Sequence, residues 1–226
     1  MWPPFLAALV DGVTLRLTDD RRVLRRRHRK FFEAFAPFAG LHRRDVIELI
    51  ESEAAPVLAR PYFQGAQTSP IVASLAHVPE VLEVAMPFIG LVLGPSAIDA
   101  RTKELVILRT SALLECEYCV ASHTVVALDS GVAASEARAL RGGDVSAAFP
   151  DAREAALLHW VDAVAAGVGG VAPAAGAALA GHFSEPEIVE LTLLCAATMM
   201  LNRYCTALGL PTGHSTLSRL AAEGFA

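Results

Sequence analysis

Apolar residues recur at helical spacing along almost the whole chain, and no stretch alternates apolar and polar residues convincingly as a half-buried strand does. The pattern predicts a nearly all-α protein. Glycines such as Gly131 are typical helix stops, and Asp99 is a typical start. The glycine- and alanine-rich stretch 167–181 is expected to be a flexible connection. The predicted helices cover residues 19–37, 43–58, 69–92 with breaks before Pro79 and Pro87, 98–114, 116–130, 134–141, 151–166 and 185–208.

The chain is rich in apolar side chains, because 54% of its 226 residues are hydrophobic and its mean hydropathy is +0.43. Monomers rarely expose large apolar patches, so we expect helix faces to be buried in a homo-oligomer, although an alanine-rich interior would raise the same numbers. No run reaches the roughly 18 consecutive apolar residues of a membrane span. The N-terminus lacks a basic leader and a clear cleavage site. These features predict a cytoplasmic protein that does not enter a membrane.

A basic run occupies residues 21–30, which hold seven Lys and Arg residues and no acid, although the whole chain has a formal net charge of −5. A nucleic-acid site is one interpretation of this run. Apolar residues such as Leu24 and Phe31 interleave with the basic ones, which favours an amphipathic helix with a solvated arginine face. We therefore do not expect nucleic acid to be a partner. Residues 1–60 are predicted to form a helical extension that contains the basic segment, and residues 61–226 the main all-α domain.

Two cysteines, Cys116 and Cys119, are followed one helical turn later by His123. Spacings of three and four place the three side chains along one stripe of a helix, where thiol and imidazole can touch. The thiolate is the reactive form of cysteine, and a free thiol with a pKa of about 8.5 is mostly protonated at neutral pH. His123 can accept that proton, and a helix start near Cys116 favours negative charge on sulfur. A second thiol can then resolve a sulfenic acid by forming a disulfide.

Other roles for cysteine stay open. Buried cysteines pack well as small hydrophobes, and this is the expected role of Cys195 and Cys205, which have no histidine near them in the sequence. Two thiolates, an imidazole and a carboxylate are also zinc ligands, but three ligands on one helical stripe close a tetrahedral site poorly. We expect no metal and no cofactor. Four cysteines are too few for a secreted disulfide scaffold of this length.

Residues 104–119 align without gaps with residues 190–205, at an offset of 86 positions, since 190 − 104 = 86. Cys116 meets Asn202 in this alignment, so the second stretch lacks the reactive set. A duplicated helical unit with one working site is one interpretation, and chance agreement between short helical stretches is the other.

The pattern of Glu104, eleven residues, Cys116, two residues, Cys119, three residues and His123 resembles the AhpD-like alkylhydroperoxidase branch of the carboxymuconolactone decarboxylase family. By this resemblance Cys119 attacks the peroxide, Cys116 closes the disulfide, and His123 with Glu104 relays the proton. The helix start instead favours Cys116 as the thiol of lower pKa. We follow the resemblance and assign the attack to Cys119. Tyr118 stands where the best-known peroxidases carry histidine, so no proton-relay role is carried over to it.

The resemblance covers residues 77–132, which are similar to the family's core, and residues 202–211, which are similar to its closing helix. It implies an AhpD-like helical bundle that assembles as a homo-trimer or hexamer. It also implies a thiol-dependent peroxidase that is reset by a dithiol reductant, with a dihydrolipoyl carrier as the suggested one.

Two other functions stay open at this point. In a lyase of the decarboxylase branch, a histidine and acidic residues act on a lactone or keto acid, and no disulfide is needed. A redox-sensing helical oligomer without catalytic turnover is the second. The paired thiols favour the peroxidase.

Overall fold

The computed structural model describes residues 46–64, 68–142, 144–167 and 169–225, and within these residues it contains helices and turns but no strand. The predicted all-α class is therefore confirmed. The predicted helix 19–37 and the basic run 21–30 lie outside the described residues. The elements, in chain order, are η3 (Ser52–Ala54), η4 (Arg60–Tyr62), α2 (Pro70–Leu75), α3 (Pro79–Leu93), α4 (Ala100–Leu113), α5 (Glu117–Asp129), α6 (Ala134–Leu140), α7 (Val145–Ala148), α8 (Ala152–Ala165), α9 (Pro173–Ala180), α10 (Glu185–Leu208) and α11 (His214–Ala222).

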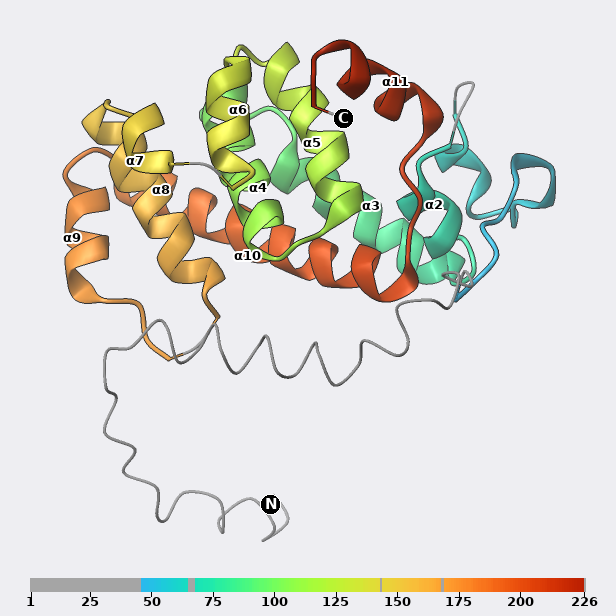
Figure 1. Ribbon diagram of the computed structural model, residues 1–226. Helices are drawn as coiled ribbons and strands as arrows, with labels where there is room; N and C mark the ends of the chain where they lie inside the picture. The colour runs from blue at the N-terminus through green and yellow to red at the C-terminus, as the bar shows by residue number, and fades with distance from the viewer. Residues whose placement is uncertain (1–45, 65–67, 143, 168, 226) are drawn as a thin grey trace, which may run out of the picture. The chain divides into compact units, whose positions relative to one another are not determined.

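Helix α4 lies among α5, α6, α8 and α10 and packs against all four (Figure 1). Its four consecutive residues 105–108 are all buried, which means that the helix is covered on every side. The carboxylate of Asp99 starts the helix by accepting a hydrogen bond from the N–H of Thr102 at 2.8 Å. Side chains from the middle of α4 therefore point into the protein interior rather than into solvent.

Helix α10 is the second long element of the core. Its start is fixed by Ser184, whose N–H and hydroxyl both donate to the Glu187 carboxylate. Among the described residues it is the helix that is long and apolar enough to cross a membrane, by length and composition alone. The core helix of a bundle has the same composition, and α10 packs against α3, α4, α5 and α8.

Polar residues of α4 are buried together with its apolar ones, and each has a partner. The Lys103 ammonium donates to the carbonyl oxygens of Val92 and Gly94, at 3.2 and 2.6 Å, and pairs with the Glu190 carboxylate at 2.9 Å. These contacts join the end of α3 and the start of α10 to α4. Buried charges are tolerated only when they are paired in this way.

Residues 46–63 pack against α2 and α3. The N–H of Ile50 donates to the carbonyl of Ala73 at 3.3 Å, and Ala59 is buried beside Val72 and Leu82. The predicted helix 43–58 is wrong over residues 46–58, which hold the short turn η3 and extended backbone. Pro56 interrupts a helix at Ala55, which is extended, because proline disfavours helical backbone in the residue before it. The division of the chain at residue 60 stays a prediction.

Two further expectations about helix ends are wrong. Helix α3 runs through Pro87, where the sequence predicts a break, and it ends only at Leu93. The stretch 167–181 is not one flexible connection, because it contains α9, whose residues Ala175 and Leu179 are buried in the core. The predicted break before Pro79 is confirmed, since α2 ends at Leu75 and α3 starts with Pro79.

The two stretches that align in the sequence differ in backbone. Residues 190–205 lie within the single helix α10, whereas residues 104–119 contain the end of α4, a turn and the start of α5. They are therefore not two copies of one helix–turn–helix unit.

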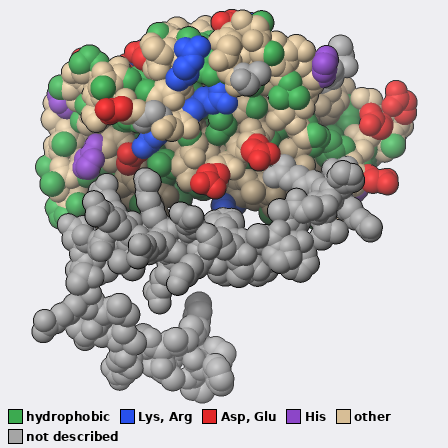
Figure 2. All heavy atoms as spheres, viewed as in Figure 1, with side chains coloured by type: hydrophobic (Ala, Val, Ile, Leu, Met, Phe, Trp, Pro, Cys, Tyr) green, Lys and Arg blue, Asp and Glu red, His purple; other side chains and the backbone are tan. Residues whose placement is uncertain are grey.

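On the face of the described residues seen in Figure 2, Lys and Arg side chains stand in small groups among acidic ones, and acidic side chains gather at the right edge, where the segment around η3 lies. The basic run that the sequence shows is not among these residues.

Candidate active site

A tight turn between α4 and α5 sets the position of Cys116. Glu115 has a left-handed backbone, with φ of 54°, at a position where glycine is usual. The N–H of Cys116 donates to the carbonyl of Ser111 at 3.1 Å, which closes the turn. A non-glycine residue in this conformation costs about 1–3 kcal/mol, and such strain clusters at functional sites. The turn makes Cys116 the N-cap of α5, where its Sγ accepts the N–H of Cys119 at 3.4 Å.

The two thiols of the Cys-x-x-Cys pair are neighbours in space. Both cysteines are free, and their Sγ atoms lie 2.7 Å apart. A disulfide bond measures about 2 Å, so a small movement would join them. Cys116 is 1% exposed and Cys119 is 5% exposed, which places the pair inside the protein rather than at its surface.

A third thiol, Cys205 of α10, packs against this pair. Cys116, Cys119 and Cys205 form one buried cluster with Leu210, and partly buried side chains of Leu49, Ile71, Tyr118, Tyr204 and Leu208 close around it. The sequence pattern predicts packing as the role of Cys205. The structure adds that what it packs against is the Cys-x-x-Cys pair.

The three thiols share their protons unequally. Hydrogen bonding with the Cys119 thiol, followed by that with Cys205, lowers the pKa of Cys116. The same contact with Cys116 raises the pKa of Cys119, and burial adds to this. Cys116 also raises the pKa of Cys205 to about 12. Negative charge in the reduced cluster is therefore favoured on Cys116, at the N-terminus of α5.

His123 and Glu104 form a pair between α5 and α4. Nδ1 of His123 lies 3.0 Å from Oε2 of Glu104, and the two side chains are 23% and 8% exposed. Because a carboxylate accepts, Nδ1 carries the proton and Nε2 is left as the acceptor nitrogen of the ring. Glu104 therefore holds the imidazole in the tautomer that a general base needs.

A cavity of about 80 Å³ joins the thiol to the imidazole, since Cys119 and His123 both line it. Cys116 is not among its lining residues. Five of the other lining residues are apolar, namely Ile71, Ile89, Leu93, Ile107 and Leu201, and five are polar, namely Ser111, Tyr118, Ser122, Thr198 and Asn202. Of the two paired cysteines, only Cys119 can meet a molecule in this cavity.

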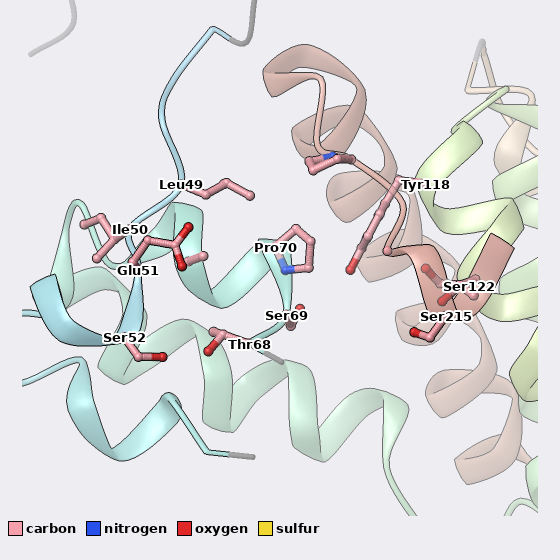
Figure 3. A pocket seen from close by; sticks show the side chains of 14 residues that line it. Leu49, Ile50, Glu51, Ser52, Thr68, Ser69, Pro70, Tyr118, Ser122 and Ser215 are labelled. Carbon is pink, nitrogen blue, oxygen red and sulfur yellow. The ribbon is translucent and has the colours of Figure 1, made fainter. Parts of the chain in front are cut away.

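A larger pocket of about 500 Å³ lies on the other side of Tyr118 and Ser122, which line both spaces. Figure 3 shows the Tyr118 ring among side chains from the segment around Leu49, from the start of α2 and from α5. The phenol hydrogen-bonds to Ser69 and Ser122, while burial raises the pKa of Tyr118. Tyr118 and Ser122 thus form the wall between the large pocket and the small cavity.

The structure brings the four predicted site residues into one region, as two contacting pairs: Cys116 with Cys119, and His123 with Glu104. Their catalytic roles stay predictions. Sequence reasoning missed the place of Cys205 beside the pair and of Asn202 in the cavity. No spacing in the sequence signalled either, because both lie on α10, far along the chain from the pair. Among the described residues, no group of three or more His, Cys, Asp or Glu side chains is arranged to hold a metal ion.

Comparisons with known proteins agree with the fold. Residues 79–163 match the model of the carboxymuconolactone decarboxylase family. No curated protein matches the chain.

Three solved structures are similar to the chain. A protein of unknown function from Agrobacterium tumefaciens, provisionally named an antioxidant defence protein AhpD, is 27% identical with a TM-score of 0.58, over 62% of this chain and 95% of that one. An uncharacterised peroxidase-related protein with an alkylhydroperoxidase AhpD core, from Ralstonia eutropha JMP134, is 18% identical with a TM-score of 0.66, over 77% and 95%. The debrominase Bmp8 with 2,3,4-tribromopyrrole is 17% identical with a TM-score of 0.67, over 80% and 98%. The last two share the fold alone.

Proposed function

Because the chain belongs to the carboxymuconolactone decarboxylase family through residues 79–163 and has the AhpD-like fold, we propose that it is a thiol-dependent peroxidase. The observation that carries the proposal is the cavity that Cys119 shares with His123, while a second thiol lies 2.7 Å from the first. A thiol, a base that a carboxylate orients and a resolving thiol are the parts that reduction of a peroxide requires.

The first step oxidises Cys119. His123 takes the thiol proton, and the Cys119 thiolate attacks the terminal oxygen of the hydroperoxide. The sulfur–oxygen bond forms as the oxygen–oxygen bond breaks, and the leaving alkoxide takes the proton from His123 to become an alcohol. The products are one alcohol, or water from hydrogen peroxide, and one sulfenic acid on Cys119.

The second step forms the disulfide. The Cys116 thiolate attacks Sγ of Cys119, the sulfur–oxygen bond breaks, and the hydroxide that leaves takes a proton to become water. A dithiol reductant then returns two electrons and two protons to the pair and becomes a disulfide itself. A dihydrolipoyl carrier has this chemistry, and we propose it as the reductant.

Two features of the site favour different cysteines for the attack. Protonation favours Cys116, whose pKa is lowered, whereas access favours Cys119, which alone of the two lines the cavity. The attacking sulfur must meet the substrate, so we assign the attack to Cys119. Cys116, whose pKa is lowered and which does not line the cavity, has the properties of a resolving thiol.

The test of this function is peroxide consumption by the purified protein with a dithiol reductant. Cys119→Ser should abolish consumption. The double variant Cys116→Ser with Cys205→Ser should still oxidise once and leave a sulfenic acid, seen by mass spectrometry of the intact protein as the gain of one oxygen, because no other thiol of the cluster remains. Cys195→Ser is the matched control, since Cys195 is also buried but lies in a different cluster, against Thr110. Full activity in both Cys119→Ser and Cys116→Ser would disprove the mechanism.

A lyase that acts on a lactone or keto acid is the second candidate, since the matched family is named for a decarboxylase. In that case His123 and Glu104 would do the chemistry and the thiols would be dispensable. Turnover of carboxymuconolactone that survives Cys119→Ser and disappears in His123→Gln would favour the lyase over the peroxidase.

We also propose that the protein is a homo-oligomer. Helix α3 exposes a stripe of large apolar side chains at helical spacing, namely Val81, Val84, Phe88 and Leu91, of which Val84 and Leu91 are 73% and 77% exposed. Such a stripe on one helix is typical of an interface. Sedimentation should show a trimer or hexamer for the wild type and a smaller species for the variant that carries both Val84→Glu and Leu91→Glu. A monomeric wild type would disprove the assembly.

A further inference from the structure

Asn202 is a buried polar side chain with one end unused. It is 1% exposed, and its Oδ1 accepts the Ser111 hydroxyl at 3.1 Å. No described residue accepts a hydrogen bond from its Nδ2. A buried donor without an acceptor costs about 1–3 kcal/mol, so its retention in a core helix needs a reason.

The surroundings of Asn202 point to the reason. Asn202 lines the cavity of about 80 Å³ that also holds Cys119 and His123. Ser111, which fixes the amide through Oδ1, lines the same cavity. Thr198, one turn before Asn202 on α10, directs its hydroxyl to the Leu194 carbonyl at 2.8 Å and has no donor left for a ligand. The Nδ2–H of Asn202 therefore donates neither to α10 nor to Ser111, and it is available to a molecule in the cavity.

We propose that Asn202 is a substrate-binding residue, whose Nδ2–H donates to an oxygen of a small hydroperoxide beside Cys119. This inference rests on the proposed peroxidase function. It adds which side chain binds an oxygen of the peroxide and how large the substrate can be. In the first step the oxygen–oxygen bond breaks and negative charge develops on the leaving oxygen. A fixed donor at that oxygen stabilises the transition state more than the ground state. The proton that completes the alcohol still comes from His123.

The size of the cavity limits the substrate. One water molecule needs roughly 10–15 Å³ of such space, so about 80 Å³ accepts a solute of only a few heavy atoms. Pockets for larger organic ligands measure about 300–1,000 Å³. The apolar walls from Ile89, Ile107 and Leu201 suit a short alkyl group. Hydrogen peroxide and short-chain alkyl hydroperoxides fit this description, whereas aromatic or fatty-acid hydroperoxides do not.

The test compares two reactions of the Cys119 thiol in the purified protein. Oxidation by ethyl hydroperoxide has an oxygen leaving group, whereas alkylation by iodoacetamide depends on the same thiolate but releases iodide. We divide the rate constant for oxidation by the rate constant for alkylation. A change in the fraction of Cys119 that is ionised affects both and cancels, so the ratio depends on the contact between Asn202 and the leaving oxygen. Asn202→Asp keeps the shape and the acceptor for Ser111 while removing the donor, and Asn202→Leu removes both polar ends. Each should lower the ratio by about 10²-fold.

Thr198→Val is the matched control, because it removes a hydroxyl from the same cavity and the same helix without removing a free donor. Its ratio should stay within about twofold of the wild type. If both rate constants fall together in the Asn202 variants, so that the ratio is unchanged, the role of Asn202 is structural and the proposal is wrong. If no peroxide oxidises Cys119 of the wild type, the proposed function itself is overturned.

The substrate size is tested on the wild type alone, so it does not depend on any variant folding. Ethyl hydroperoxide should oxidise Cys119 at least about tenfold faster than cumene hydroperoxide, because the cumyl group is too large for the cavity and a misfit of one methylene is already worth about tenfold. Ile107→Ala should narrow the difference by enlarging the cavity. Equal wild-type rates for the two peroxides would refute the size limit.

Discussion

The buried ammonium of Lys103 gives a prediction about stability that can be worked out from three distances. Its bonds to the carbonyls of Val92 and Gly94, at 3.2 and 2.6 Å, are hydrogen bonds from a charged donor, each worth about 1.5–3 kcal/mol. Lys103→Met keeps the length of the side chain and removes both. At the low end of that range it should lower the free energy of unfolding by about 3 kcal/mol. The Tm should fall by roughly 6–12 °C for a chain of this size.

Glu190 is the third partner of the Lys103 ammonium, at 2.9 Å, and it allows a double-mutant cycle. Glu190→Gln leaves the ammonium of Lys103 buried without its counter-charge, which should also cost about 3 kcal/mol. The double variant removes the ammonium as well, so it should be no less stable than Lys103→Met alone. The two single costs therefore should not add, and the coupling energy should approach about 3 kcal/mol.

Urea unfolding of the reduced protein, followed by far-UV circular dichroism, measures all three variants and the wild type. Arg219 and Glu223 provide the control pair, because they lie four residues apart on the surface at 2.9 Å and should show no measurable coupling. If the costs of Lys103→Met and Glu190→Gln add within about 0.5 kcal/mol in the double variant, the reasoning about a buried ammonium and its partly exposed counter-charge is refuted.

Three further predictions concern the site and the response to pH. His123→Gln should shift the pH profile of Cys119 oxidation to higher pH, measured by stopped flow with peroxide, because the thiol must then ionise without its base. In Cys116→Ser, Cys205 is the thiol left beside Cys119, so peptide mapping after one equivalent of peroxide should find a disulfide between Cys119 and Cys205, and its absence would contradict the three-thiol cluster. The hydrogen bond from Arg101 lowers the pKa of the Glu136 carboxyl in the folded state. The stability that the ionised carboxyl contributes is therefore present above pH ~4.5, and it is lost as the pH falls through the lowered pKa of the folded state. Glu136→Gln should therefore flatten the acid limb of a plot of unfolding free energy against pH.

The long helices could be predicted from the sequence because their apolar spacing is a local signal. Helix α4 was expected at 98–114 and runs from Ala100 to Leu113, and α10 was expected and found from residue 185 to 208. Helix α9 was missed because glycines precede it and alanine shows no amphipathic contrast, although Pro173 at its first turn is a helix-start signal. Its buried residues Ala175 and Leu179 are apolar like their neighbours, so the pattern did not reveal which face is covered.

The site was predictable to the extent that it is local in the sequence. The spacing of Cys116, Cys119 and His123 indicated a thiol pair and a base, and the resemblance to a family supplied Glu104. Cys205 and Asn202 lie on α10, more than eighty residues away, and only the packing of α10 against α4 and α5 brings them to the pair. No spacing rule connects residues at that distance.

The N-cap position of Cys116 links the chemical state of the pair to the mechanics of a helix. The reduced sulfur accepts the Cys119 amide and thereby ties down the first turn of α5. A disulfide sulfur carries no charge and is a weak acceptor. If the pair cycles as proposed, forming the disulfide should loosen that turn, which also carries Tyr118, and reduction should restore it. Amide hydrogen exchange at Cys119 should therefore report the redox state of the pair.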